Sequence, residues 1–112
     1  MRRQPALFDA ASNVGSDLIH LRQFAEARAF LRQHLAAARD VLGSDHMYVF
    51  RLAFNLSSAL RFGDPSREHL VEAEAVLQDS LRTGRRVFGP DYSHVREMEE
   101  SLRIVTGMLS GD

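Results

Sequence analysis

Hydrophobic residues recur every three or four positions along most of the chain, and polar residues fill the positions between them. This spacing gathers apolar side chains on one face of an α-helix. The pattern predicts five helical segments, which cover residues 5–20, 23–42, 46–62, 67–88 and 92–110. The chain is therefore predicted to be all-α, with successive helices running antiparallel.

Residues with special backbone preferences mark the predicted helix ends. Gly43 follows the second helix, where glycine adopts a left-handed conformation at little cost. Residues 63–66 contain glycine, aspartate, proline and serine, and they separate the third helix from the fourth. Ser66 is expected to cap the fourth helix by accepting a hydrogen bond from a free backbone N–H group. Asp45 and Asp91 are expected to cap the third and fifth helices in the same way.

The third and fifth helices distribute their apolar residues differently. The third helix carries Val49 and Leu56 on one side and Phe50 and Phe54 on another, so we expect it to pack on two sides. The fifth helix has a single apolar stripe, and its opposite face is charged. A helix with one polar face suits the end of a repeat array, where one side stays in contact with water.

An internal repeat runs through the chain. Residues 24–60 reappear in degenerate form as residues 70–106, at an offset of 46 positions. The first and third helices repeat at an offset of 42, as Asn13 and Asn55 show, because four extra residues lie in the turn at 63–69. Such a period indicates stacked helical units that bury their apolar faces only against neighbours.

Short motifs within the repeat resemble a known family. The matching stretches are Asn55-Leu56-Ser57, Phe24-Ala25-Glu26-Ala27-Arg28, Glu72-Ala73-Glu74, Leu42-Gly43-Ser44-Asp45-His46 and Phe88-Gly89-Pro90-Asp91-Tyr92. They resemble the tetratricopeptide repeat (TPR) family, in the 42-residue variety found in kinesin light chains. Met47 stands where that pattern has proline, Tyr92 where it has histidine, and Ser101 where it has a third asparagine.

The resemblance implies a short right-handed α-solenoid of two helix pairs plus a capping helix. The first repeat would span residues 6–43, the second 46–89, and the capping helix 92–110, within a single TPR-like domain over 1–112. Two complete repeats are fewer than the roughly three that usually give stability. Either the fifth helix completes the fold, or the chain forms a dimer.

The resemblance also implies a concave groove along the first helix of each pair. In that family, asparagines at the positions of Asn13 and Asn55 bond the backbone of a bound peptide, since a carboxamide both donates and accepts. The implied partner-binding groove consists of Asn13, Ser16, Arg51, Phe54, Asn55, Ser58, Phe62, Glu97 and Ser101. Its register also includes Asp9, Ser12 and Met108.

Three of these residues have more than one interpretation. Phe54 and Phe62 would anchor an apolar group of the partner if they face the groove. For Phe62 we favour the alternative, in which it packs against the lengthened turn at Leu70 or Val71. Arg51 would pair either with a carboxylate of the ligand or with an acid of the chain itself.

Some relatives grip a free C-terminal carboxylate through lysine, asparagine and arginine residues of the groove. In this chain the matching positions retain only Asn55, and Glu97 carries the opposite charge. We therefore do not expect this groove to recognise an acidic C-terminal tail.

Composition removes several other function classes. The formal net charge is −1, and all fourteen basic residues are arginine, so there is no general basic field for nucleic acid or an anionic membrane. The absence of cysteine excludes disulfides and thiolate metal sites. No apolar run is long enough for a secretory signal or a membrane span, which favours a cytoplasmic protein.

No motif in the sequence indicates a catalytic or metal-binding site. Five histidines are present, but none belongs to the pairs that hold a metal between helices. His94 and His46 are interpreted as capping or surface residues at helix starts. Phosphate-loop and serine-hydrolase motifs are also missing. We expect no enzyme activity, no metal and no cofactor.

The sequence thus predicts a non-catalytic interaction module that binds a protein or peptide in its concave groove. The alternative is a self-association module, a homodimer formed through exposed repeat ends and the third-helix aromatics Phe50, Phe54 and Phe62. A third and weaker possibility is a regulatory subunit that binds a small molecule between its helices.

Overall fold

The computed structural model describes residues 3–111 and contains five α-helices there. They are α1 (Arg3–His20), α2 (Phe24–Leu42), α3 (Met47–Arg61), α4 (Arg67–Val87) and α5 (Ser93–Leu109). The all-α prediction is confirmed, and the predicted helix boundaries differ from the observed ones by two residues at most. Residues 1, 2 and 112 of the predicted domain lie outside the described residues.

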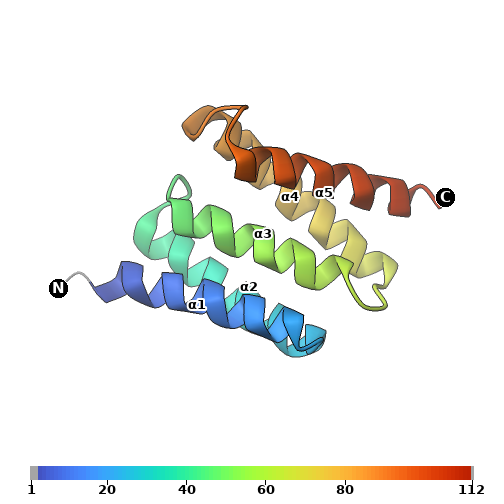
Figure 1. Cartoon of the computed structure of the whole chain (residues 1–112), viewed down its shortest axis with the longest axis horizontal. Coiled ribbons are helices and arrows are strands. Elements are labelled where there is room, and N and C mark those ends of the chain that lie inside the picture. Colours follow the sequence, from blue (N-terminus) through green and yellow to red (C-terminus); the bar gives the residue numbers. More distant parts are fainter. Residues whose placement is uncertain (1–2, 112) are drawn as a thin grey trace.

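The helices form two layers. Each helix packs against the next one along the chain, and α1 also packs against α3. In Figure 1, α1, α3 and α5 lie toward the viewer, with α2 and α4 behind them. This arrangement is that of a helical-repeat solenoid, as the internal repeat predicts.

The core fills the space between the two layers. Its fully buried side chains include Leu31, Leu52, Leu60, Leu77, Leu81 and Met98. Glycine allows close approach at two places in this core. A Cβ atom on Gly15 would lie 2.4 Å from Leu31 Cδ2, and one on Gly84 would lie 2.4 Å from Phe50 Cε1. These two contacts bring α1 close to α2 and α4 close to α3.

The end of α3 and the start of α4 follow the prediction. Ser66 Oγ accepts a hydrogen bond from the backbone N–H of His69 at 3.1 Å, and His69 Nδ1 accepts one from the Ser66 N–H at 3.4 Å. The two residues form a reciprocal capping box, which satisfies two N–H groups of the first turn. Gly43 also has the expected positive φ, at +85°.

The two predicted aspartate caps are wrong. His46 is the N-cap residue of α3, and its Nδ1 accepts the N–H of Tyr48 at 3.0 Å. Asp45 instead accepts a hydrogen bond from Arg86 at 3.0 Å, so its carboxylate connects the loop before α3 with α4. The N-cap position of α5 is Tyr92, next to Asp91, and it makes no side-chain capping bond.

Ion pairs on the outer surface connect α2 with α4. Arg32 donates two hydrogen bonds to the Glu72 carboxylate, at 2.8 and 2.7 Å. These bonds hold the pKa of Glu72 below its usual range, because they favour the ionised form. Arg39 and Asp79 lie 3.6 Å apart two turns further along. Both pairs are partly exposed, so each adds little to stability.

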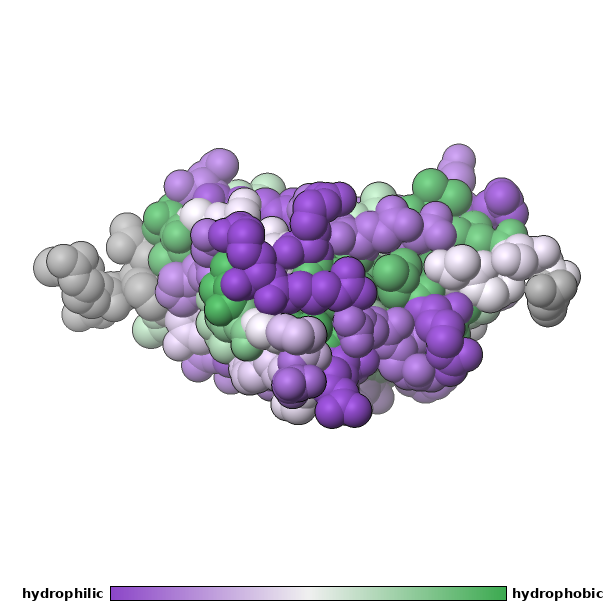
Figure 2. Space-filling model, turned by 90° about the horizontal axis from the view of Figure 1, so that it is seen from above, coloured by the Kyte–Doolittle hydropathy of each residue, from purple (hydrophilic) through white to green (hydrophobic). Residues whose placement is uncertain are grey.

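The two ends of the solenoid have different surfaces. The face seen in Figure 2, from the side of α4 and α5, is mostly hydrophilic with small hydrophobic areas between. Arg96, Glu100 and Arg103 are exposed on α5, as expected for a helix with one polar face. At the other end, α1 exposes Leu7 and Val14, and the turn that follows it exposes Leu21. None of the described helices has the length and apolarity to cross a lipid bilayer.

Candidate binding groove

Two polar links hold α1 beside α3. Arg51 Nη1 donates a hydrogen bond to Asp9 Oδ1 at 2.8 Å. Asn55 Nδ2 donates to the backbone oxygen of Ser12 at 3.0 Å and to Ser12 Oγ at 2.9 Å. Of the two interpretations of Arg51, the structure therefore has the pairing with an acid of the chain itself.

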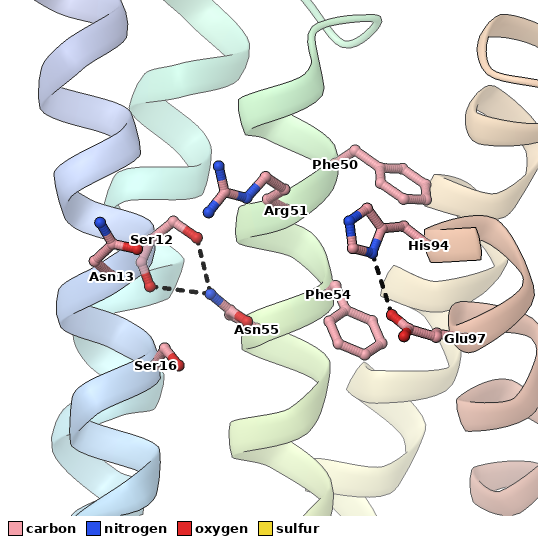
Figure 3. Close-up of a pocket in the computed structure, with 9 residues that line it drawn as sticks. All are labelled: Ser12, Asn13, Ser16, Phe50, Arg51, Phe54, Asn55, His94 and Glu97. Carbon is pink, nitrogen blue, oxygen red and sulfur yellow. Dashed lines mark hydrogen bonds and ion pairs between the residues drawn. The ribbon is translucent and has the colours of Figure 1, made fainter. Parts of the chain in front are cut away.

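The space between α3 and α5 is less closely packed than the space between α1 and α3. The main packing partner of α5 is α4, and α3 and α5 do not pack to a comparable extent. Tyr92, the N-cap residue of α5, donates its hydroxyl to Met47 Sδ at the start of α3 at 3.6 Å. Beyond this contact, no hydrogen bond or ion pair joins the two helices within residues 3–111. Figure 3 shows Arg51 and Asn55 pointing from α3 toward α1, whereas Phe50 and Phe54 point toward α5. The polar side of α3 thus closes the space between α3 and α1, and its aromatic side borders the open space between α3 and α5.

A pocket of about 220 Å³ lies along this open interval. Its lining comes from α1, α3 and α5, the three helices of one layer. The lining residues are Ser12, Asn13, Ser16, Phe50, Arg51, Phe54, Asn55, His94 and Glu97. We call the surface formed by these nine residues the groove.

Aromatic rings form the end of the groove nearest the start of α5. The ring of Phe50 packs edge-on against Phe88, with centroids 5.4 Å apart. Phe88 contacts Tyr92 at 5.5 Å, and Tyr92 meets His94 edge-on at 5.2 Å. Phe50 is buried and fits beside Gly84, so these contacts fix the wall of the groove from behind.

The comparison with protein families agrees with this architecture. A sequence model described as "Tetratricopeptide repeat" matches residues 7–69, over half of the chain. The chain belongs to the tetratricopeptide repeat family. The match begins within α1, covers α2 and α3, and ends in the first turn of α4. No curated protein and no solved structure matches the chain.

The family membership carries a general function. Tetratricopeptide repeats generally mediate protein–protein interactions and are typically non-catalytic. The described part of this TPR chain also contains no cluster of three or more histidine, aspartate or glutamate side chains placed to hold a metal ion. The likeness to the kinesin light chain variety, and the repeat boundaries, stay predictions.

Six of the nine predicted groove residues of this TPR chain lie around the pocket. They are Asn13, Ser16, Arg51, Phe54, Asn55 and Glu97. The other three lie elsewhere. Ser58 is half-buried on α3, Ser101 is buried on α5, and Phe62 follows the last turn of α3. Phe62 is exposed, and the guanidinium of Arg61 lies 4.1 Å from its ring centroid.

Two lining residues were not expected from the sequence. Phe50 was placed on the second apolar face of its helix, and the spacing alone does not say that this face borders a pocket. His94 was interpreted as a capping or surface residue, yet its Nδ1 lies 3.2 Å from Glu97 Oε1 within the groove. The separation of three positions between His94 and Glu97, one helical turn, was the available signal.

The groove therefore has three chemically distinct parts. The α1 side offers the carboxamide of Asn13 and the hydroxyl of Ser16, neither of which makes a hydrogen bond with another described residue. The middle offers the ring of Phe54. The α5 side offers His94 and Glu97, both exposed. Such an arrangement can bind polar backbone groups and one apolar group at the same time, and it holds no nucleophile and base in contact.

Proposed function

We propose that this TPR protein is a non-catalytic module that binds an extended peptide segment of a protein partner in the groove. The observation that supports the proposal is the pocket itself, because six of the nine predicted groove residues, from α1, α3 and α5, line it. Its volume of about 220 Å³ is smaller than most small-molecule sites, at roughly 300–1,000 Å³, which favours a peptide side chain over a free metabolite.

Binding would combine an apolar contact with hydrogen bonds to the peptide backbone. Phe54 supplies an aromatic surface in the middle of the groove. Asn13 is exposed and offers both a donor and an acceptor. The NH₂ group of Asn55 is already bonded to Ser12, so Asn55 offers only its oxygen, as an acceptor of a peptide N–H. For so small an area we expect micromolar affinity, about −8 kcal/mol.

The test begins with a library of random dodecapeptides displayed on phage and selected against the folded domain. The best peptide is then synthesised, and its affinity is measured by calorimetry. The Phe54→Ser substitution should weaken binding about tenfold, since it removes the aromatic contact. The matched control is Phe62→Ser, at the residue that follows α3, an exposed phenylalanine outside the groove, which should change affinity less than about twofold.

Phe54 also packs partly against the core, so a second variant guards against loss of folding. Asn13→Ala removes an exposed carboxamide and leaves the fold intact, and it should weaken the same peptide a few-fold. Equal affinity of the parent, Phe54→Ser and Asn13→Ala proteins would remove the groove from the binding reaction.

A specific observation on α1 favours self-association as a second candidate function. Leu7 and Val14 correspond to Val49 and Leu56, which lie 42 positions later in α3. Val49 and Leu56 are 4% and 2% exposed, whereas Leu7 and Val14 are 63% and 43% exposed. The outer side of α1 therefore keeps apolar residues that the next repeat buries, and Leu21 continues this stripe.

The occupant that fits this stripe is a second copy of the chain. Stacking end to end would place the apolar α1 against the polar face of α5, which leaves charges buried without partners. Leu7 and Leu21 each lie seven positions from Val14. Two copies of this segment can therefore pair antiparallel across a two-fold axis, with Leu7 of each copy opposite Leu21 of the other. The contact would lie on α1 and would not include Phe50, because Phe50 is buried.

A further inference from the structure

One groove position carries a charge on all three helices of the layer. Asp9 on α1 corresponds to Arg51 on α3 at the 42-residue offset, and Arg51 corresponds to Glu97 on α5 at the 46-residue offset. An arginine thus stands between two carboxylates in the repeat register. Whichever carboxylate it does not bind is left for another cation.

Arg51 forms an ion pair with α1. Its Nη1 donates to Asp9 Oδ1 at 2.8 Å, and its guanidinium also lies 5.9 Å from the ring centroid of Tyr48. This pair closes the α1–α3 interval and neutralises the charge of both groups. The α1 side of the groove is therefore electrically balanced.

Glu97 lacks an equivalent partner on α3. Its polar partner is His94, on its own helix, with Nδ1 3.2 Å from Oε1. The Glu97 side chain is 59% exposed and lines the groove together with Phe54. Apart from the Arg51–Asp9 pair, the acidic or arginine side chains that line the groove reduce to one carboxylate, that of Glu97, and it lies on the α5 side.

A carboxylate and an aromatic ring in one pocket suit a long cationic side chain. The methylene stem of such a side chain covers apolar surface while its charged head reaches a carboxylate. A guanidinium is favoured over an ammonium, because it stacks on an aromatic face and bonds a carboxylate through two parallel N–H groups. A pocket of about 220 Å³ holds one such side chain and not a folded element.

We infer that the α3–α5 half of the groove binds an arginine side chain of the partner peptide, with its stem on Phe54 and its guanidinium at Glu97. The inference rests on the proposed function and adds to it the chemistry of the partner. The arginine from outside would do in the α3–α5 interval what Arg51 does in the α1–α3 interval, where it joins two helices through a carboxylate.

The probes are three capped tripeptides: Ac-Leu-Arg-Leu-NH₂, Ac-Leu-Nle-Leu-NH₂ with the uncharged norleucine, and Ac-Leu-Glu-Leu-NH₂. Each is titrated into ¹⁵N-labelled protein at low salt, and the amide signals of Phe54 and Glu97 are followed by NMR. The arginine peptide should shift both signals with a dissociation constant about fivefold lower than that of the norleucine peptide. The glutamate peptide should bind most weakly of the three.

Substitutions on α5 assign the preference to one carboxylate. Glu97→Gln should remove most of the preference for the arginine peptide, and Glu97→Arg should reverse it toward the glutamate peptide. The matched control is Glu100→Gln, an exposed glutamate one turn away that pairs with Arg103 and does not line the groove. This control should keep the full preference.

The outcomes separate the inference from the proposed function. If all three peptides shift the Phe54 signal with the same constant, the groove binds peptides but the arginine site is wrong. If Glu97→Gln and Glu100→Gln change the preference equally, Glu97 is not the contact. If none of the tripeptides, and no peptide selected from the random library, shifts a groove signal, both the inference and the proposed function are overturned.

Discussion

The carboxamide of Asn55 forms hydrogen bonds within the protein that connect α3 with α1. Its NH₂ group bonds both the backbone oxygen and the hydroxyl of Ser12, across 43 positions of sequence. Asn13, at the equivalent position of the preceding helix, is exposed and forms no such link. Two asparagines with the same place in the repeat therefore have different roles, because only α3 has a neighbour on that side.

This difference predicts unequal stabilities for two alanine variants. Asn55→Ala should lower the free energy of unfolding by about 1–2 kcal/mol, because the Ser12 oxygen atoms lose their donor. Asn13→Ala, the control, should stay within about 0.5 kcal/mol of the parent protein, as is usual for an exposed side chain. Urea denaturation followed by circular dichroism measures both values. Matching unfolding curves for the two variants would show that the α1–α3 link contributes nothing.

Single side chains were the hardest part to predict from sequence. The partner of Asn55 lies in another helix, so no local pattern reveals the bond. Asp45 was expected to cap α3, but its carboxylate accepts a hydrogen bond from Arg86, 41 positions away. His46 caps the helix instead. The placement of His94 in the groove likewise depends on how α5 faces α3. Six of the residues predicted to bind a partner nevertheless line one pocket, because the repeat register fixes which helix face they share, and their role in binding stays a prediction.

At the scale of helices, the contact between Gly84 and Phe50 sets how closely α4 approaches α3. A Cβ atom on Gly84 would lie 2.4 Å from Phe50 Cε1, well inside van der Waals contact. Phe50 is buried, and its ring also packs against Phe88, so it has little room to move. The same ring forms part of the groove wall, which ties the helix packing to the shape of the groove.

Two glycine-to-alanine variants test this contact. Both Gly84 and Gly107 are helical, so alanine should gain about 1 kcal/mol of helix propensity at each. A Cβ atom on Gly107 would meet nothing within 4 Å, so Gly107→Ala should stabilise the protein. Gly84→Ala also overpacks the core, and it should be less stable than Gly107→Ala by about 1–3 kcal/mol. Thermal unfolding of the two variants side by side measures this difference. Equal melting temperatures would mean that Phe50 moves aside freely.

The helices themselves could be predicted well, because their signals are local. Glycine or proline marks the turns after α2, α3 and α4, and the apolar spacing identifies each buried face. The turn between α1 and α2 contains neither residue, and there Arg22 has a positive φ of 62°. The spread between α3 and α5 could not be predicted in this way. The sequence shows that four residues are inserted at 63–69, but the width of the interval depends on how Phe50, Phe88 and Tyr92 fill the space behind it.

At the scale of the whole molecule, the two ends of the solenoid are unequal. The α1 end exposes Leu7, Val14 and Leu21, whereas the α5 end exposes charged residues. Unequal ends oppose the growth of open filaments, since one end cannot accept the other. They favour a closed pair in which like ends meet.

A dimer through α1 makes a direct prediction for molar mass in solution. Light scattering across a concentration series should show a transition from monomer to dimer. Val14→Glu places a charge at the centre of the α1 stripe and should keep the protein monomeric. The control is Val71→Glu on α4, since Val71 is also an exposed valine but lies outside the stripe, and this variant should dimerise like the parent. A parent protein that stays monomeric throughout the series would exclude the α1 dimer.

The aromatic end of the groove also gives the protein an optical reporter of its own. The chain has no tryptophan and two tyrosines, and both tyrosines adjoin groove residues. Tyr48 lies beneath the guanidinium of Arg51, and Tyr92 packs against the ring of His94. Tyrosine fluorescence from the unmodified protein therefore originates entirely beside the groove. A ligand that displaces either neighbour changes this emission, so binding can be followed without a dye or a tag, provided the ligand itself has no tyrosine or tryptophan.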